Sequence, residues 1–480
     1  EAEPATLESR IRAREPAEWG GLDKLVAQAQ RLAFKLSGLD GADITFGTGE
    51  DQTSAGPFRI DAAGNATALP QERVTDVVLS PELLTSGGFG NLSVSNPEGS
   101  ILIPENVNLA TQPGGSITLT SSRIEVLGNV SAAGGSLTFN VHNISPYLAA
   151  QQVASGAPVQ LPLTPGLGIF ILGDGASLST AGSVTDDRFS SSGNVAALPD
   201  GGSVTIQSND VNLGTGSIID VSGGYAMTSK GTGRFGNGGS ITIKSGQDLA
   251  QPSAIGGNLT LNGSLVGYSG AKGGSLSLQA TTVQIGGAAA AAGSLHLQPD
   301  FFNQGGFGSF ALTGLVPSAG NPAVWVAPDT IVAPIVKSLA LAPDPTNNQP
   351  VSLQVIENPA GLRQGANLTL SAPGARDVTN GLVSRGDVLV DEGAIIRTEA
   401  GGSFRATGNT VSILGSIITP GGNITIGGGG NTASAFQDPN RALATTYIGA
   451  NAHLSAAGTT VLAPDPFGRR TGTVLNGGNI

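Results

Sequence analysis

A short phrase recurs along this chain at a nearly regular spacing. It reads Gly-Gly, then Ser or Asn, then apolar, polar and apolar residues, as in "GGSITL" from residue 114 and "GGSVTI" from residue 201. Copies, some of them looser, begin at residues 114, 134, 201, 238, 256, 273, 292, 365, 401, 421 and 477. Most of the intervals lie near multiples of 18–20 residues. Such a period indicates a repeat architecture in which each unit stacks on the previous one.

Each copy alternates apolar and polar residues, which is the two-residue period of a half-buried strand. Further short strands lie between the copies, and Ile124, Val126 and Val130 are predicted to point inward. Frequent β-branched residues and Gly oppose a helix, and the scarcity of Asn-Gly and Asp-Gly turns opposes a stack of hairpins. The sequence therefore predicts an all-β fold, a right-handed parallel β-helix (solenoid) with about three strands per coil. About 15–20 coils would make a rod on the order of 70–100 Å long.

The glycine pairs are predicted to form the corners between the faces of a coil. A corner requires a positive φ or a tight approach between adjacent coils, and glycine permits both. We therefore expect most of the second glycines Gly115, Gly202, Gly239 and Gly274 at turns or strand starts, in backbone conformations that other residues adopt only at a cost.

A second phrase occurs twice, as "PELLTSGGFGNL" at 81–92 and "PDFFNQGGFGSF" at 299–310. The copies share glycines and bulky apolar residues rather than polar chemistry, and each leads into an alternating strand. This pattern predicts a structural element in which a helical turn follows the proline and two bulky residues plug the interior. Phe89 and Phe307 are both expected to be buried, with the same backbone path in the two segments.

Composition restricts the class of protein. Gly and Pro number 73 and 28, but 39% of the residues are hydrophobic and only 12% are charged, which indicates a folded, turn-rich chain rather than a disordered one. A net charge of −12 without a basic stripe argues against nucleic-acid binding. The 480 residues include no cysteine, as is typical of exported bacterial surface proteins, and no apolar run reaches the ~18 residues of a transmembrane segment.

Three stretches depart from the period. Residues 1–40 are predicted to form an α-helical cap over the open end of the solenoid, or a docking segment for a neighbouring subunit; the apolar stripe of that helix comprises Leu22, Leu25, Val26, Ala29, Leu32, Ala33 and Leu36. Residues 145–170 and 315–362 are Pro-rich, and the second stretch carries Trp325. The expected domains are the helical segment 1–40, a parallel β-helix over 41–314, a Pro-rich insertion over 315–362 and a parallel β-helix over 363–480 that continues beyond this piece.

Several of these repeats resemble one known family. "GGSITLTSSRIEVLGNVSAAGGS" (114–136), the two "GGFG" phrases and "GSIIDVSGGY" (216–225) are similar to the large filamentous-haemagglutinin-like exoproteins of Gram-negative bacteria, over about residues 80–480. The resemblance implies two-partner secretion through an outer-membrane pore partner and a role as adhesin, surface filament or stalk. The secretion domain of that family carries an Asn-Pro-Asn-Gly turn, which "NPEGSI" (96–101) matches only in part because Glu98 replaces the second Asn; we interpret it as an ordinary turn.

The sequence offers little chemistry for catalysis. Polysaccharide hydrolysis needs two carboxylates on one face, and the only Asp-Asp pair is Asp186-Asp187, beside Arg188. His142, His296 and His453 are isolated and have no metal-ligand spacing. Catalytic, cofactor-binding and metal-binding residues are therefore each assigned as none. Asn-x-Ser/Thr sequons, among them the one at Asn143, are interpreted as corners rather than glycosylation sites.

We therefore predict a non-enzymatic extracellular or cell-surface rod, a segment of a filamentous-haemagglutinin-like exoprotein that serves as a stalk, adhesin or filament subunit. The alternative is a β-helical polysaccharide-binding or polysaccharide-degrading enzyme. Expected partners are the outer-membrane pore during secretion, other copies or surface proteins in filaments, and a glycan or host-surface ligand.

Overall fold

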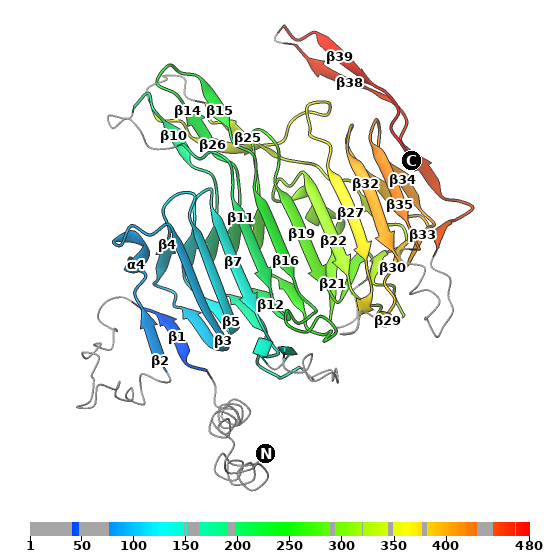
Figure 1. The fold of residues 1–480 in the computed structure, drawn as a ribbon. Coiled ribbons are helices and arrows are strands. Elements are labelled where there is room, and N and C mark those ends of the chain that lie inside the picture. Colours follow the sequence, from blue (N-terminus) through cyan, green and yellow to red (C-terminus); the bar gives the residue numbers. More distant parts are fainter. Residues whose placement is uncertain are drawn as a thin grey trace, which may run out of the picture.

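The protein is built almost entirely of β-strands, most of which pair in parallel (Figure 1). The computed structural model describes residues 41–47, 76–147, 149–150, 163–189, 197–288, 293–318, 320–343, 349–376, 382–429, 445–465 and 467–480. The predicted helix within 1–40 lies outside these residues. The two helical elements with defined bounds are single turns, α4 (Glu82–Thr85) and the 3-10 turn η1 (Pro299–Asn303). The predicted all-β class with parallel strands is confirmed.

One sheet, here called the wide sheet, runs through the whole described stack (Figure 1). Its strands follow the order β3 (Asn91–Ile103), β5 (Ser116–Val126), β7 (Ser136–Val141), β11 (Ser203–Gln207), β16 (Ser240–Lys244), β19 (Ser275–Ala280), β22 (Ser309–Gly314), β27 (Asn367–Ala372), β32 (Ser403–Gly408) and β35 (Asn423–Gly427). The residue after each glycine pair aligns with its counterpart, as in Ser116↔Ser136 and Ser136↔Ser203. The repeated phrase therefore sets the register of this sheet.

Two further faces complete the stack. The second face is formed by the ends of β3 and β5 together with β8 (Ile169–Leu172), β12 (Asp210–Leu213) and β17 (Leu259–Leu261). It continues in a separate sheet of β21 (Ser294–Leu297), β20 (Thr282–Ile285), β23 (Val324–Val326), β30 (Asp387–Val390), β33 (Thr410–Ile413) and β36 (Thr446–Ile448). At the N-terminal end of the stack, β1 (Asp43–Phe46) pairs with β3 and with β2 (Asp76–Leu79).

The third face is likewise divided into two sheets. The first contains β4 (Asn108–Ala110), β6 (Asn129–Ser131), β9 (Ser177–Ser179), β13 (Ile218–Asp220) and β18 (Ser264–Val266). The second contains β24 (Ile331–Val332), β31 (Ile395–Arg397), β34 (Ser416–Ile418) and β37 (His453–Ser455). The wide sheet has no such break.

The chain visits the three faces in turn, and one such passage is called a circuit. It runs from β11 through β12 and β13 and then reaches β16, which pairs with β11 in register. Circuits in the wide sheet range from 20 residues (Ser116 to Ser136) to 67 residues (Ser136 to Ser203). The described stack thus has ten strands in this sheet, from β3 to β35, and spans about 43 Å at ~4.8 Å per strand. The expectation of 15–20 coils was wrong because most circuits carry excursions.

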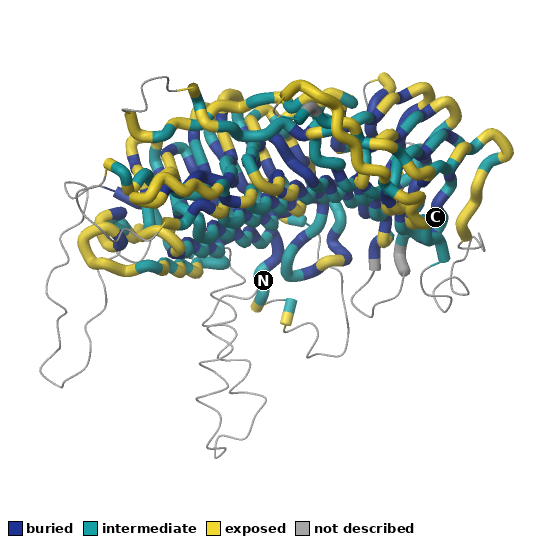
Figure 2. The backbone as a smooth tube through the Cα atoms, turned by 90° about the horizontal axis from the view of Figure 1, so that it is seen from above, coloured by how far each residue is buried: buried dark blue, intermediate teal, exposed yellow. Residues whose placement is uncertain are grey.

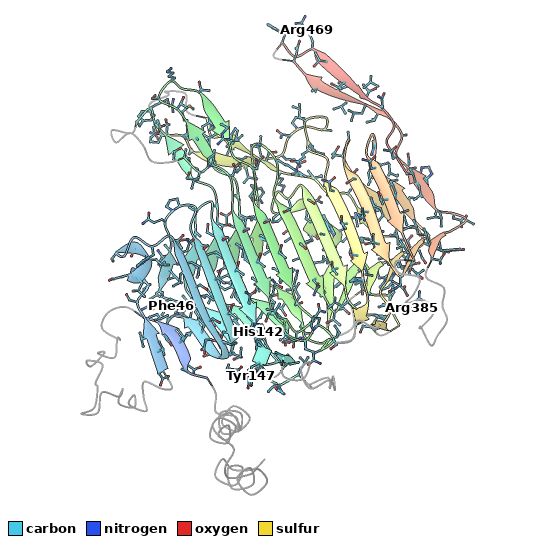
Figure 3. All side chains as sticks on the ribbon, viewed as in Figure 1. Phe46, His142, Tyr147, Arg385 and Arg469 are labelled. Atoms are coloured by element: carbon cyan, nitrogen blue, oxygen red, sulfur yellow. The ribbon has the colours of Figure 1, made fainter. Side chains whose placement is uncertain are left out.

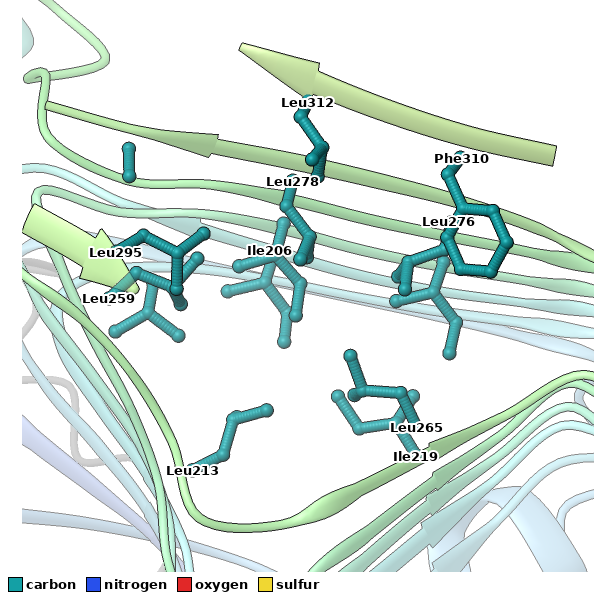
Figure 4. Close-up of a cluster of buried hydrophobic side chains, with 14 of the residues drawn as sticks. Ile206, Leu213, Ile219, Leu259, Leu265, Leu276, Leu278, Leu295, Phe310 and Leu312 are labelled. Atoms are coloured by element: carbon teal, nitrogen blue, oxygen red, sulfur yellow. The ribbon is translucent and has the colours of Figure 1, made fainter. Parts of the chain in front are cut away.

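The core lies between the three faces and is mainly aliphatic. Strands such as β7 and β11 alternate buried and half-buried residues, so one side of each strand faces inward. Ile124, Val126 and Val130 are fully buried, which confirms their predicted inward direction. Figure 4 shows side chains from different faces meeting in this interior, and Figure 2 shows buried stretches running through the stack. Each fully buried aliphatic side chain contributes about 1.5–3 kcal/mol.

The second glycines form a ladder along the edge of the wide sheet. A Cβ on Gly202 would fall against the carbonyl oxygen of Gly135, and one on Gly239 against that of Gly202, well inside the 3.0 Å that real Cβ atoms keep. Neither glycine has a left-handed φ, nor do Gly115 and Gly274. The expectation of a costly backbone conformation was therefore wrong for these four positions, and the close approach of successive circuits is what requires glycine.

The segment "NPEGSI" forms the corner at which β3 passes from the wide sheet to the second face. The register with β5 shifts between Asn96 and Ser100, so the corner is a bulge within a strand rather than a separate turn. The Gly41 amide donates to the carbonyl of Glu98 (2.9 Å), which ties β1 to this corner.

Residues 315–362, expected to form an insertion, contribute β23 and β24 to the second and third faces. Trp325 lies on β23 and donates from its indole Nε1 to Asp391 Oδ2 (3.0 Å). Its position is that of a half-buried strand residue on the second face. Only the end of this stretch leaves the stack, as the hairpin described below.

Candidate functional site

A slot of about 630 Å³ opens where the second and third faces are interrupted. One wall is formed by β17 and β18, and the opposite wall by β21 and η1. Its apolar floor includes Leu259, Leu265, Leu295 and Leu297, whose side chains belong to the hydrophobic core (Figure 4). Leu259 and Leu265 are each 8% exposed, whereas their neighbours Val211 and Ile219 in the preceding circuit are 1% and 0% exposed. The slot therefore reaches from solvent into the core.

An extra strand explains why the slot exists. After β20 the chain returns to the second face as β21, which pairs in parallel with β20 on the side away from β23. The wide sheet gains no strand there, since β16, β19 and β22 pair directly. On the third face η1 occupies the place of a strand between β18 and β24. Neither wall can then pair with the other, and the two faces separate.

The repeated Gly-Gly phrase does not mark one position throughout the chain. The copies that begin at 256 and 292 form β17 and β21, which lie on the second face and not in the wide sheet. These two strands are the walls of the slot. The sequence contained a signal for this site, because the starts at 238, 256, 273 and 292 follow one another more closely than a full circuit allows.

The phrase at 299–310 supplies the other side of the wall. Pro299 begins η1, Phe302 and Phe307 are 1% and 2% exposed, and both pack against Phe310 at ring-centroid distances of 5.2 and 6.0 Å. Gly305 and Gly306 have φ values of 71° and 70°, which turn the chain back toward the wide sheet. The predicted plug and helical turn are present here.

The phrase at 81–92 shares only part of this structure. Pro81 precedes the helical turn α4 and Leu84 is buried, but Leu83 and Phe89 are 49% and 62% exposed. Its backbone also differs, because α4 is α-helical and Gly87 lacks the positive φ of Gly305. The expectation that both phenylalanines are buried was wrong for Phe89. Phe307 is covered by the circuit that contains Gly267, and β3 has no preceding wide-sheet strand among the described residues.

The rim of the slot is polar and nearly neutral. Its half-buried or exposed side chains include Thr260, Asn262, Gln298 and Gln304, together with the one carboxylate, Asp300, and the one ammonium, Lys337, of the lining. His296 also lines the slot, and its Nε2 lies 3.0 Å from the Gly286 carbonyl oxygen and 3.3 Å from Gln298 Nε2. The outward, half-buried position predicted for His296 is confirmed.

The other two histidines lie far from the slot. His142 ends β7, and burial lowers its pKa, while the carboxylates of Asp248 and Glu98 act in the opposite direction (Figure 3). Asp248 accepts from the amides of Asn143 (2.7 Å) and Ile144 (3.2 Å). His453 lies exposed on β37. Within the described ranges, no three His, Cys, Asp or Glu side chains are grouped as metal ligands.

Four excursions leave the stack between the third face and the wide sheet, along the upper edge in Figure 1. They contain β10 (Val184–Asp186), the pair β14 (Tyr225–Met227) and β15 (Gly233–Phe235), the hairpin β25 (Ser338–Leu341) and β26 (Leu353–Ile356), and the hairpin β38 (Thr459–Pro464) and β39 (Arg470–Leu475). The first three pack together as a lobe. The fourth stands alone with Arg469 near its tip (Figure 3), and its Phe467 and Val474 are 80% and 73% exposed.

The Asp186-Asp187 pair lies in this lobe and has a structural role. Arg188 donates to Asp186 Oδ2 (2.8 Å), and the Val351 amide donates to the same oxygen (3.1 Å) from the neighbouring hairpin. The Arg188 side chain, with the Val351 amide, lowers the pKa of Asp186 to about 2. The carboxylate therefore stays ionised near neutral pH and cannot act as a general acid.

The sequon at Asn143 is also structural. Asn143 is 6% exposed, its amide donates to the carbonyls of Thr164 (2.9 Å) and Leu167 (2.7 Å), and its Oδ1 accepts from the Thr164 amide (2.7 Å). A glycan on this side chain would break all three bonds.

No protein-family model, curated protein or solved structure matches this chain. None of the helices in the described part of the chain has the length and apolar character needed to span a bilayer.

Proposed function

We propose that the chain is a right-handed parallel β-helix that serves as a non-enzymatic extracellular or cell-surface rod, a segment of a filamentous-haemagglutinin-like exoprotein. The observation that carries the proposal is the uninterrupted wide sheet, in which ten described strands pair in parallel and in register while the chain visits three faces in turn. Parallel crossovers are right-handed in about 98% of cases, which supports the hand. A stack of this kind grows along one axis and gives a rod rather than a sphere.

The excursions support an adhesive role for this rod. The lobe and the β38–β39 hairpin project from one edge, while the wide sheet and its glycine ladder remain regular. Insertions on one side of a repeat protein often form its binding surface. In this proposal the stack is the stalk, the projecting edge contacts a glycan, a host surface or another copy, and secretion uses an outer-membrane pore partner.

The alternative is a β-helical protein that binds or cleaves polysaccharide, and the slot is the feature that favours it. Hydrolysis by the usual mechanism needs two carboxylates about 5–9.5 Å apart, and Asp300 is the one acid among the residues that line the slot. This lining supports binding better than cleavage.

Two measurements on the purified chain test the proposal. Small-angle scattering should show an elongated particle, and negative-stain images should show single rods for an adhesin or ordered polymers for a filament subunit. Antibodies against the chain should label the surface of intact source cells and the culture medium. A globular scattering profile, or label confined to permeabilised cells, would overturn the rod or its location respectively.

A further inference from the structure

We propose that the slot between β17–β18 and β21–η1 binds an extended polypeptide segment of a partner protein, which pairs with the strand edges that form its walls. This inference depends on the geometry of the slot and goes beyond the proposed role of the rod. It names a site, a ligand class and a mode of recognition, β-strand addition.

The first argument comes from the main-chain groups of β17. This strand bonds to β12 through the Asn258 carbonyl, which accepts from Val211 (2.9 Å), and through the Asn262 amide, which donates to Leu213 (3.0 Å). Successive residues of a parallel strand direct their main-chain groups to alternate sides. The amides and carbonyls of Leu259 and Leu261 therefore point into the slot.

The facing wall has the same character. β21 bonds to β20 through the Leu297 carbonyl, which accepts from the Gly286 amide (2.8 Å). By the same alternation, the main-chain groups of His296 point toward β17. β17 ends one sheet and β21 begins the next, so both walls of the slot are strand edges. Edges of this kind are templates for an added strand.

The second argument comes from the side chains and the volume. An extended segment alternates its side chains, so that apolar ones would meet the floor of Leu259, Leu265 and Leu295 while polar ones would meet the rim. A volume of about 630 Å³ holds about five residues at the packing density of protein interiors. The rim carries one carboxylate and one ammonium, so the slot selects by shape and alternation rather than by net charge.

The test uses the full chain and a labelled peptide of sequence GSIIDV, acetylated and amidated at its ends. This sequence is residues 216–221, which include β13 and pair with the other edge of β18. Fluorescence anisotropy should show saturable binding. A peptide in which the position of Ile219, fully buried in β13, is changed to Asp should bind at least tenfold more weakly.

Two matched variants of the protein locate the site. Gln304 is an exposed slot residue with an extended backbone (φ −107°, ψ 161°), so Gln304→Trp should fill the slot without disturbing the fold and weaken peptide binding at least tenfold. Gln112→Trp, at an exposed corner outside the slot, should bind like the parent protein. Circular dichroism checks that both variants remain folded.

Three results would overturn the proposal. One is the absence of saturable peptide binding up to about 1 mM, the weak end of specific recognition. Another is equal binding by the Gln304→Trp and parent proteins, which would place the peptide elsewhere. The third is binding of cellotetraose, lost in Gln304→Trp, without binding of the peptide, which would assign the slot to a neutral glycan.

Discussion

Replacing Gly239 by Ala tests whether the close approach of circuits requires the glycine ladder. The added Cβ would fall against the Gly202 carbonyl oxygen and 2.8 Å from the Gly201 carbonyl carbon. One of the two strands must then move by about 1 Å to reach an ordinary contact distance. The Gly202 oxygen also accepts from the Ser240 amide (2.9 Å), so this movement weakens a ladder hydrogen bond.

The magnitude follows from these two effects. Overpacking of this kind costs about 1–3 kcal/mol, and a weakened hydrogen bond costs about 1 kcal/mol more. Gly239→Ala should therefore destabilise its region by about 2–4 kcal/mol. Because long repeat stacks can unfold in steps, native-state hydrogen exchange is the suitable assay. The amides of β11 and β16 should exchange about 30- to 900-fold faster.

Gly90→Ala is the matched control. Gly90 holds the same ladder position before β3, but a Cβ there meets nothing within 4 Å and its φ lies outside the left-handed region. Its substitution should be neutral or stabilising by up to about 1 kcal/mol. If Gly239→Ala and Gly90→Ala change exchange equally, close approach is not the reason for glycine. Tolerance does vary along the ladder: Ala366 holds the position beside Gly308, near η1.

Two further predictions concern the repeated phrase and the lobe. Phe307→Ala should lower the free energy of unfolding by about 3–5 kcal/mol, whereas Phe89→Ala should change it by less than about 0.5 kcal/mol; equal losses in chemical denaturation would contradict the burial difference. The Asp186 carboxyl should titrate near pH 2 by carbon-13 NMR rather than near its ordinary 3.8, because Arg188 and the Val351 amide favour its ionised form. Since the folded-state pKa is lowered, its stabilisation is complete above about pH 4 and disappears as the pH falls through about 2, so Asp186→Asn should be less stable than the parent at pH 7 and equally stable below pH 2; a constant difference would contradict the assignment.

Much of the fold could be predicted because its causes are local in sequence. Alternation of apolar and polar residues dictates which side chains of β7 or β11 face inward, and the glycine pair places the first residue of each strand beside its counterpart. The pairing Ser136↔Ser203 crosses 67 residues, yet the two phrases are nearly identical. The prediction of glycine positions was right in place and wrong in cause, because a sequence shows that a Cβ is excluded but not which atom excludes it.

The candidate site could not be predicted in the same way. The copies that begin at 256 and 292 have the same local preference for an extended strand as the others, and this preference does not specify the face on which a strand lies. Their assignment to the second face depends on the extra strand β21, which pairs with β20 rather than with β17. The slot results from that mismatch between neighbouring circuits.

The sequence by itself determined the strand periodicity, the register of the wide sheet and the helical turn after Pro81 and Pro299. Only the tertiary structure decided burial, as the two phrases demonstrate: Phe89 is 62% exposed and Phe307 is 2% exposed although both follow Gly-Gly. The physical reason is that backbone preference arises from each residue and its neighbours in the chain. Removal of a side chain from water instead requires another part of the chain to lie over it, as the circuit at Gly267 lies over Phe307.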